Sequence, residues 1–462
     1  MRIVVCLKQS ASGELNPLDA CAYEAALSIE GAEVIIISMG PNKSEELLLE
    51  LSRLGAARSI LICDRAFAGS DTLATAYVLS LAIKKLSPDL VFCGNKTVDG
   101  ETGQVGIELA QMLSFNSISR AMSIDAGADK ILCKMRNGEV KEALYPALVT
   151  VERINTLRLP SIFSRAKEVE IWDAEYLSAD TSLCGLNGSA TKVLKSEENL
   201  QDRRSCKKIN ASVFFSVLDS ALNEKAETQK EEYNGAKMRG VWAFSKEALE
   251  EAEPLCEDIK LFELDDPEKI AQRIEKEKPQ VILWASDDKS KEISSKVAAI
   301  LGLGLCADCT ALETDGNEMF FYRPAFSGSV VAKIKCTKSP AMATLRTKTE
   351  TKSPVVVGVG MGVKGNIAEV EQFANKIGAD MAASRAIVDS GALPYEMQVG
   401  VTGRSISPEV YIAIGISGAV HHISGIRTAK TIIAINPDKD APIFDFADYG
   451  IVMPFEDFLK NI

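Results

Sequence analysis

Tyr411-Ile-Ala-Ile-Gly-Ile-Ser-Gly-Ala-Val-His-His422 is the stretch of this sequence that decides its fold. Short apolar runs at residues 411–414, 431–435 and 450–452 border small polar residues, in Gly400-Val-Thr-Gly-Arg404, Ile435-Asn-Pro-Asp438 and Ala447-Asp-Tyr-Gly450. This pattern is typical of an open α/β sheet whose strand ends line a crevice. We therefore predict a nucleotide-sized site at these strand ends.

The segment Gly415-Ile-Ser-Gly418 carries no bulky side chain. Backbone N–H groups at the start of a following helix could therefore approach a pyrophosphate, helped by the helix dipole. Both histidines of the chain, His421 and His422, follow it directly. A glycine-rich turn between a strand and a helix, with both histidines satisfied, is the alternative interpretation of the same residues.

Further motifs surround this stretch in a fixed order. They are Gly378-Ala-Asp-Met-Ala-Ala-Ser-Arg-Ala-Ile-Val-Asp389, Gln398-Val-Gly400 and Ala441-Pro-Ile-Phe444. Together with the opening stretch, they resemble the FAD-binding domain of the electron transfer flavoprotein alpha subunit from about residue 355 onward. Several ordered motifs are a far more specific signal than one glycine pattern.

The resemblance implies a role for each matching residue. Ser384, Arg385, Gln398 and Thr402 would surround the isoalloxazine, with Thr402 near N5 and His422 near O2. Ser417 and the glycines would hold the pyrophosphate, and Asn436 and Asp448 the adenosine end. The complete expected set is Ser384, Arg385, Gln398, Thr402, Gly403, Gly415, Ser417, Gly418, His422, Asn436, Asp438 and Asp448.

Composition indicates a soluble protein of a reducing, cytoplasmic compartment. A net charge of −12 leaves no basic surplus for a nucleic-acid partner. No apolar run reaches membrane-spanning length, and Met1-Arg-Ile-Val-Val-Cys-Leu-Lys8 is too short for a signal peptide, so we predict a first strand there. The 11 cysteines have no regular spacing, which suits small apolar residues better than a disulfide framework.

One Cys-x-x-Cys motif, Cys306-Ala-Asp-Cys309, could suggest a metal. A zinc site needs four ligands, usually from two such motifs, so we interpret this one as structural and predict no metal. We likewise predict no catalytic residues, because electron transfer needs no acid, base or nucleophile.

An internal sequence repeat divides the rest of the chain into two similar copies. Residues 88–92, 108–113 and 146–151 are similar to residues 279–283, 296–301 and 340–345, and each copy reads as strand, loop, helix, β-hairpin and strand. We predict an α/β protein with two similar doubly wound domains, the second with the smaller sheet, plus a C-terminal FAD-binding α/β domain. The expected boundaries are 1–225, a polar linker at 226–238, then 239–350 and 351–462.

The two copies differ where a ligand would bind. The first has Gly94-Asn-Lys-Thr-Val-Asp-Gly-Glu-Thr-Gly-Gln-Val-Gly106, a glycine-rich loop that opens a helix. The second has Ser286-Asp-Asp-Lys-Ser-Lys-Glu-Ile-Ser-Ser295, which is acidic and lacks glycine. We therefore expect a nucleotide in the first copy and none in the second. The alternative for the first copy is a plain surface loop.

Residues 1 to about 222 resemble the beta subunit of the same family. The matching stretches are Asn16-Pro-Leu-Asp19, Asp64-Arg-Ala-Phe-Ala-Gly-Ser-Asp-Thr-Leu-Ala-Thr75, Val98-Asp-Gly-Glu-Thr-Gly-Gln-Val-Gly106, Leu159-Pro-Ser-Ile162 and Gly185-Leu-Asn-Gly-Ser-Ala-Thr-Lys192. The resemblance implies a fused beta–alpha chain that docks a partner through Leu159. It also implies a second nucleotide, AMP or FAD, at Asp99, Thr102, Gly103, Gln104, Val105 and Gly106.

Three functions are open at this point. The first is an FAD-containing carrier between an acyl-CoA-type dehydrogenase and another redox partner, without a substrate of its own. The second is an NADH-oxidising, electron-bifurcating oxidoreductase with a second FAD in the beta-like domain; the motifs favour it, and the short Lys8-Gln-Ser-Ala-Ser-Gly-Glu-Leu-Asn16 segment argues against it. The third is a regulatory protein that binds adenine nucleotides and has lost the redox role.

Overall fold

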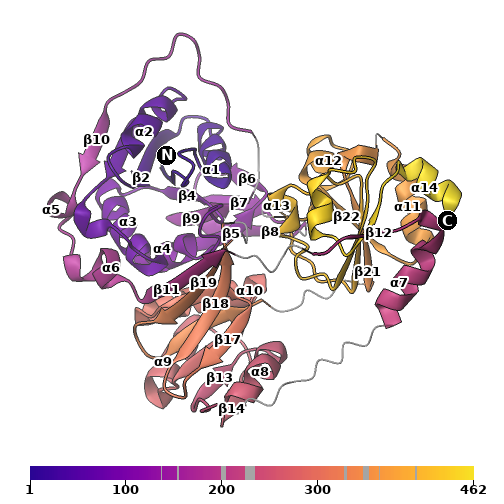
Figure 1. The fold of residues 1–462 in the computed structure, drawn as a ribbon. Coiled ribbons are helices and arrows are strands. Elements are labelled where there is room, and N and C mark those ends of the chain that lie inside the picture. Colours follow the sequence, from indigo (N-terminus) through magenta and orange to yellow (C-terminus); the bar gives the residue numbers. More distant parts are fainter. Residues whose placement is uncertain are drawn as a thin grey trace. The chain divides into compact units, whose positions relative to one another are not determined.

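The chain folds into two compact units of α/β architecture (Figure 1). The computed structural model describes residues 1–136, 138–152, 156–198, 204–223, 235–326, 330–346, 353–363, 365–400 and 403–462. The larger unit comprises Met1–Glu197, Glu232–Phe326 and Val330–Thr347, and the C-terminal unit comprises Glu198–Glu231, Ser327–Ser329 and Lys348–Ile462. We call residues 1–197 the first repeat and residues 235–346 the second repeat.

A parallel sheet forms the centre of the first repeat, with the strand order β10-β3-β2-β1-β4-β9-β5. Helices α1 and α2 pack on one face and α3 and α4 on the other, so the repeat is doubly wound. The strands are β1 (Arg2–Cys6), β2 (Glu33–Met39), β3 (Arg58–Ile62), β4 (Leu90–Gly94), β5 (Asn116–Ala121), β9 (Ala147–Val151) and β10 (Val169–Trp172). The helices are α1 (Pro17–Leu27), α2 (Ser44–Ser52), α3 (Thr72–Leu86), α4 (Val105–Leu113), α5 (Ala174–Leu177) and α6 (Gly185–Gly188).

The second repeat has a shorter version of the same sheet, in the order β14-β13-β15-β20-β16. Helix α8 packs on one face, and α9 and α10 pack on the other. The elements are β13 (Val241–Ala243), α8 (Lys246–Ala252), β14 (Ile259–Leu261), α9 (Pro267–Glu277), β15 (Val281–Ala285), α10 (Asp288–Leu301), β16 (Leu305–Cys309) and β20 (Ala341–Leu345). The predicted pair of similar domains, with the smaller sheet in the second, is confirmed.

Each repeat also carries an antiparallel sheet of hairpin strands. In the first repeat it is formed by β6 (Ser123–Ala126), β7 (Lys130–Lys134) and β8 (Val140–Leu144). In the second repeat it is formed by β17 (Ala311–Thr314), β18 (Met319–Ala325) and β19 (Val330–Cys336). Strand β11 (Thr191–Glu198), at the end of the first repeat, lies beside β19 and so extends the hairpin sheet of the second repeat.

The C-terminal unit has a parallel sheet with the order β12-β25-β24-β23-β21-β22. Its strands are β12 (Lys207–Lys208), β21 (Val355–Val359), β22 (Asp380–Ala383), β23 (Val410–Ile414), β24 (Thr431–Ile435) and β25 (Tyr449–Ile451). Helices α7 (Phe214–Asn223), α11 (Ile367–Lys376), α12 (Arg385–Asp389) and α14 (Phe455–Asn461) share one core, and the opposite face is covered by loops and the short helix α13 (Val420–Ile423).

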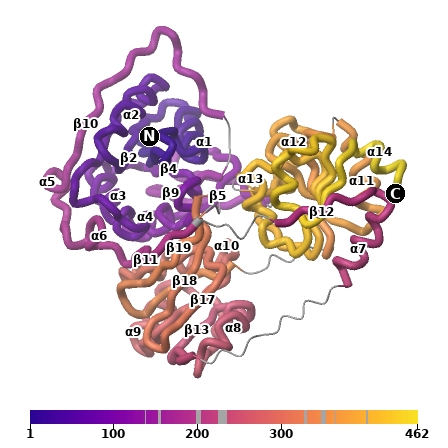
Figure 2. Tube along the Cα trace, viewed as in Figure 1, coloured from indigo at the N-terminus to yellow at the C-terminus, as the bar shows by residue number. Residues whose placement is uncertain are grey.

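The first domain does not extend to residue 225 as the sequence suggested. Residues 204–223 belong to the C-terminal unit, where β12 pairs with β25 and α7 enters the core (Figure 2). The physical reason is the apolar face of α7, whose Phe214 is fully buried against Phe373 and Phe458. The expected linker at 226–238 falls largely outside the described residues, which resume at 235.

Candidate functional site

The switch point of the C-terminal sheet lies between β21 and β23. From there the chain continues to β22 on one side and to β24 and β25 on the other. In open α/β sheets, ligands bind outside the carboxyl ends of the strands at this point. Two glycine loops meet there: the Gly362 N–H donates to the Gly415 carbonyl at 2.9 Å, and a Cβ on Gly360 would lie 2.2 Å from the same oxygen. Only glycine allows this backbone-to-backbone contact.

The residues expected to hold a pyrophosphate continue from this contact. Ser417 is exposed, and its carbonyl accepts a hydrogen bond from the Ile443 N–H at 3.0 Å. Gly418 has φ +92°, and a Cβ there would lie 2.2 Å from the Ile443 nitrogen. The helix that follows, α13, spans only Val420–Ile423, so its dipole is small. An anion here would rely on backbone N–H groups and Ser417 rather than on a helix terminus.

The two adjacent histidines lie in different environments. His421 is exposed, whereas His422 is 6% exposed and its Nε2 lies 2.9 Å from the Tyr411 hydroxyl. Its Nδ1 is buried and has no hydrogen bond of normal geometry among the described residues. Burial lowers the pKa of His422 to about 4, and the nearby Val399 backbone offsets only part of this shift. The imidazole is therefore neutral near pH 7.

Ser384, Arg385 and Gln398 lie together at the carboxyl end of β22. Ser384 precedes α12, and its buried Oγ has no hydrogen-bond partner among the described residues. Gln398 is 1% exposed and bridges to Ala383 at the end of β22. Arg385 is largely exposed and pairs with Asp389 at 3.2 Å. Thr402 lies outside the described residues.

Backbone contacts bring Gly400 beside His421 and His422. The Gly403 N–H donates to the Gly400 carbonyl at 3.0 Å. A Cβ on Gly400 would lie 2.4 Å from the His421 carbonyl oxygen. The predicted residues from β22, from this loop and from α13 therefore meet at one edge of the sheet.

The residues expected at the adenosine end are not brought together. Asn436 follows β24, where its side chain donates to the Ile416 carbonyl and accepts from the Asp438 N–H, both at 2.9 Å; Asp438 itself is exposed. Asp448 lies beside Ile432, near the amino ends of β24 and β25, where it accepts the Ile432 N–H at 2.7 Å and pairs with Arg204. The position of Asp448 thus contradicts a contact with a nucleotide at the opposite, carboxyl edge.

A second switch point lies between β1 and β4 of the first repeat. There the buried Asp19 carboxylate accepts the Lys8 N–H at 2.8 Å and the Gly94 N–H at 2.9 Å. Burial raises the pKa of Asp19 to about 7, although these hydrogen bonds oppose the shift. Asn16 donates to the Lys96 carbonyl at 3.0 Å. These side chains hold the backbone of the loop of residues 94–106. The sequence did not identify them as site residues.

The loop residues predicted to bind a nucleotide surround the start of α4. Asp99 pairs with Lys8 at 2.8 Å; burial alone would raise the pKa of Asp99, but this pairing and the Gly100 N–H hold it below its usual value. Gln104 precedes α4 without capping it through its side chain, which donates to the Leu305 carbonyl at 3.2 Å. The rest of the predicted set, Thr102, Gly103, Val105 and Gly106, lies in the same turn and the first turn of α4.

The equivalent positions of the second repeat hold larger side chains. Cys6 and Cys93 are register partners on β1 and β4, whereas the corresponding positions hold Phe244 and Trp284, stacked with ring centroids 4.0 Å apart. Helix α10 is also capped by Asp287, which accepts from the N–H groups of the next turn. These differences give a physical reason to expect a nucleotide in the first repeat and none in the second.

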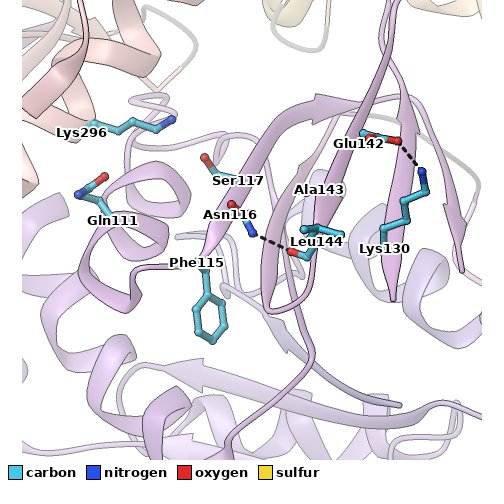
Figure 3. A pocket seen from close by; sticks show the side chains of 9 residues that line it. All are labelled: Gln111, Phe115, Asn116, Ser117, Lys130, Glu142, Ala143, Leu144 and Lys296. Atoms are coloured by element: carbon cyan, nitrogen blue, oxygen red, sulfur yellow. Dashed lines mark hydrogen bonds and ion pairs between the residues drawn. The ribbon is translucent and has the colours of Figure 1, made fainter. Parts of the chain in front are cut away.

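Two cavities among the described residues lie away from these residues. One, of about 450 Å³, is surrounded by side chains from α4, β5, β8 and α10 in the larger unit (Figure 3). Several of its polar groups already have partners: Lys130 pairs with Glu142 at 2.7 Å, Lys296 pairs with Glu292 at 2.7 Å, and Asn116 donates to the Leu144 carbonyl at 2.9 Å. Another, of about 520 Å³, lies beside β12 and α7. Neither contains a predicted site residue.

The loop of Leu159 presents an apolar tip. Leu159 is 88% exposed, and Ile162 and Phe163 are each 87% exposed. The ends of the loop are fixed, because Arg158 pairs with Glu24 at 2.7 Å and the Lys167 N–H donates to Ser52 Oγ at 2.8 Å. A loop packed on its own domain, the alternative to docking, does not match these exposures.

No helix among the described residues is both long and apolar enough to cross a membrane.

Comparisons with known proteins identify two kinds of domain in this chain. The electron transfer flavoprotein domain matches residues 3–177 and 265–375, and the electron transfer flavoprotein FAD-binding domain matches residues 349–427. An alpha subunit from Thermoanaerobacterium thermosaccharolyticum is 36% identical over 231 residues, which cover 40% of this chain and 69% of the relative.

Beta subunits are equally similar. The one from the same organism is 38% identical over 200 residues, covering 41% of this chain and 77% of the relative. A beta subunit from Clostridium acetobutylicum is 38% identical over 226 residues, covering 42% of this chain and 87% of the relative. The chain therefore belongs to the electron transfer flavoprotein family and joins regions similar to its beta and alpha subunits.

Proposed function

We propose that this protein is an electron carrier that binds FAD in its C-terminal unit. The observation that carries the proposal is the glycine cradle at the switch point between β21 and β23, within a segment that matches an FAD-binding domain. One buried polar atom near it, Ser384 Oγ, has no hydrogen-bond partner among the described residues. Such atoms are costly to bury unless a ligand satisfies them.

The residues present fit this cofactor. The exposed Ser417 and the backbone around Gly415 and Gly418, which carry no side chain of their own, would hold the pyrophosphate. Ser384 and the neutral His422 would face the flavin ring as hydrogen-bonding groups. When bound, FAD supplies one- and two-electron transfer, and the protein tunes its potential through nearby hydrogen bonds and charges.

Replacing Ser417 with Asp tests this placement. The carboxylate would crowd and repel the pyrophosphate, so we expect the S417D variant to purify with little or no FAD. Ser216→Asp is the matched control, because Ser216 is exposed on α7 and adds the same charge away from the cradle. If S417D retains the full FAD content of the control, the pyrophosphate lies elsewhere.

We also propose a second nucleotide, AMP or FAD, in the first repeat. The observation that favours it is the start of α4, which no side chain caps and which packs on the small Cys93, whereas the second repeat has the Asp287 cap and the stacked Phe244 and Trp284. With FAD in this site, an NADH-oxidising bifurcating enzyme becomes the alternative function. Titration of AMP into nucleotide-free protein should give saturable binding, and absence of binding for AMP and FAD alike would refute this second site.

We further propose that the loop of Leu159 docks a redox partner of the acyl-CoA-type dehydrogenase class, in the cytoplasm. An exposed apolar tip with fixed ends has the make-up of a small anchor with a polar rim. Leu159→Ala should therefore slow electron transfer with the partner several-fold and leave the flavin content unchanged. Leu144→Ala is the control, because Leu144 is also exposed but lies on β8. Equal transfer rates in both variants would exclude docking through this loop.

A further inference from the structure

Two cysteines of the second repeat face each other across two sheets. Cys306 lies on β16 of the parallel sheet, and Cys336 ends β19 of the hairpin sheet. Their Sγ atoms are 4.0 Å apart. A disulfide places these atoms about 2.05 Å apart, so the two sulfurs must approach each other by about 2 Å to form the bond.

The two thiols differ in access. Cys306 is 2% exposed, whereas Cys336 is only partly buried. Contact with Cys336 and burial together raise the pKa of the Cys306 thiol well above its usual value, so Cys306 is the less reactive of the two. The third cysteine of this region, Cys309, is 1% exposed, and its Sγ lies 3.5 Å from the Cys306 carbonyl rather than against another thiol.

The pair lies where the chain of the first repeat enters the second. The Thr337 N–H donates to the Ala190 carbonyl at 2.9 Å, and the Thr337 hydroxyl donates to the Ser189 carbonyl at 3.1 Å. A Cβ on Gly304 would lie 2.3 Å from the same Ala190 oxygen, so this contact is tight. The residues beside the pair, Gly304 and Thr337, thus contact residues 189–191, where β11 begins.

We propose that Cys306 and Cys336 form a reversible, peroxide-sensitive disulfide that joins the hairpin sheet of the second repeat to its parallel sheet. The Cys336 thiol attacks hydrogen peroxide, which breaks the O–O bond and gives a sulfenic acid and one water. The Cys306 thiol then attacks the Cys336 sulfur, which forms the S–S bond and releases the hydroxyl as a second water. Peroxide is reduced, the two thiols are oxidised, and a dithiol reductant reverses the reaction.

Peptide mapping after peroxide treatment of the full chain tests the proposal. We expect a linked pair of peptides containing Cys306 and Cys336, a loss of two hydrogen masses from the intact protein, and recovery of both thiols with dithiothreitol. In Cys306→Ser, the sulfenic acid on Cys336 has no neighbouring thiol to resolve it, so dimedone should label Cys336 there more strongly than in the wild type.

Cys309→Ser and Cys133→Ser serve as matched controls, because both remove a buried thiol and should leave the link intact. The proposal is overturned if the wild type, alkylated after denaturation, shows both thiols still free at a peroxide dose that oxidises the exposed methionines. It is equally overturned if the mapped link connects Cys306 or Cys336 to another cysteine.

Discussion

Tyr411 reaches His422 because a glycine on the neighbouring strand makes room for its ring. A Cβ on Gly358 would lie 1.7 Å from the Tyr411 hydroxyl, and that hydroxyl contacts His422 Nε2 at 2.9 Å. The sequence motif predicted a role for His422, but it did not predict the contact of His422 with Tyr411 or the space that Gly358 leaves for it. Their relation depends on the register of β21 and β23, which no local pattern contains.

The buried, neutral His422 predicts a specific loss of stability in acid. Its pKa is about 4 in the folded protein and about 6.5 when unfolded, so the unfolded chain binds more protons between these values. The contribution of His422 to the unfolding free energy is therefore constant above pH 6.5 and decreases as the pH falls toward 4. Urea unfolding of His422→Asn at pH 7 and pH 5 should show a smaller acid loss than the wild type.

His421→Asn is the matched control for this measurement. His421 is the adjacent residue but is exposed, so its replacement should leave the acid loss of the wild type unchanged. Equal pH dependence in the wild type and His422→Asn would mean that His422 is not buried in its neutral form.

Strand β12 and helix α7 are the elements that sequence reasoning placed in the wrong domain. The apolar periodicity of residues 211–223 predicts a helix with a buried face, but it does not say which core that face joins. Pairing of β12 with β25 links Lys207 to Tyr449, and such distant contacts leave no local signal. The strands and helices alternating along the first repeat were predictable, because each follows from its own periodicity and turns.

Phe214 should be essential to the C-terminal unit although it lies before the second repeat in sequence. It is fully buried, with ring centroids 5.0 Å from Phe458 and 5.9 Å from Phe373. Phe214→Ala should therefore lower the unfolding free energy of this unit by about 3–5 kcal/mol, measured by denaturant unfolding. The neighbouring Phe215 is 37% exposed, so Phe215→Ala is the matched control and should cost much less. Similarly small losses of unfolding free energy in both variants would mean that α7 does not enter the core.

The whole molecule is an imperfect duplication joined to a third α/β region. The two repeats keep the same strand order and even the same irregularity: Arg120 and Asp308 both have positive φ, and their N–H groups donate to Thr150 and Thr344 at 2.8 Å. The similarity of residues 88–151 to residues 279–345 predicted the shared strand order, because it includes central strands of both repeats. It could not show that Arg120 pairs with Asp288 of the second repeat, since the two residues meet only after both sheets have formed.

The chain crosses between the two units more than once, so neither unit is a continuous segment. The C-terminal unit takes up residues 204–223 before the second repeat begins, and its other described residues come from 353 onward. The part of the proposed FAD site most visible in sequence is the Gly415–Gly418 half of the glycine cradle, since its residues are consecutive. The sequence placed Asp448 wrongly. Only the pairing of β24 with β25 shows at which edge of the sheet Asp448 lies.

The nucleotides released from the purified chain test the central claim most directly. The protein is saturated with FAD, freed of unbound nucleotide and denatured, and the visible spectrum and released nucleotides are quantified against the protein concentration. A carrier with its cofactor in the C-terminal unit gives one FAD per chain in the wild type and loses it in S417D. A second FAD that survives in S417D would favour the bifurcating alternative. A wild-type chain that releases no FAD, or only AMP, would contradict the claim and favour a regulatory protein that binds adenine nucleotides.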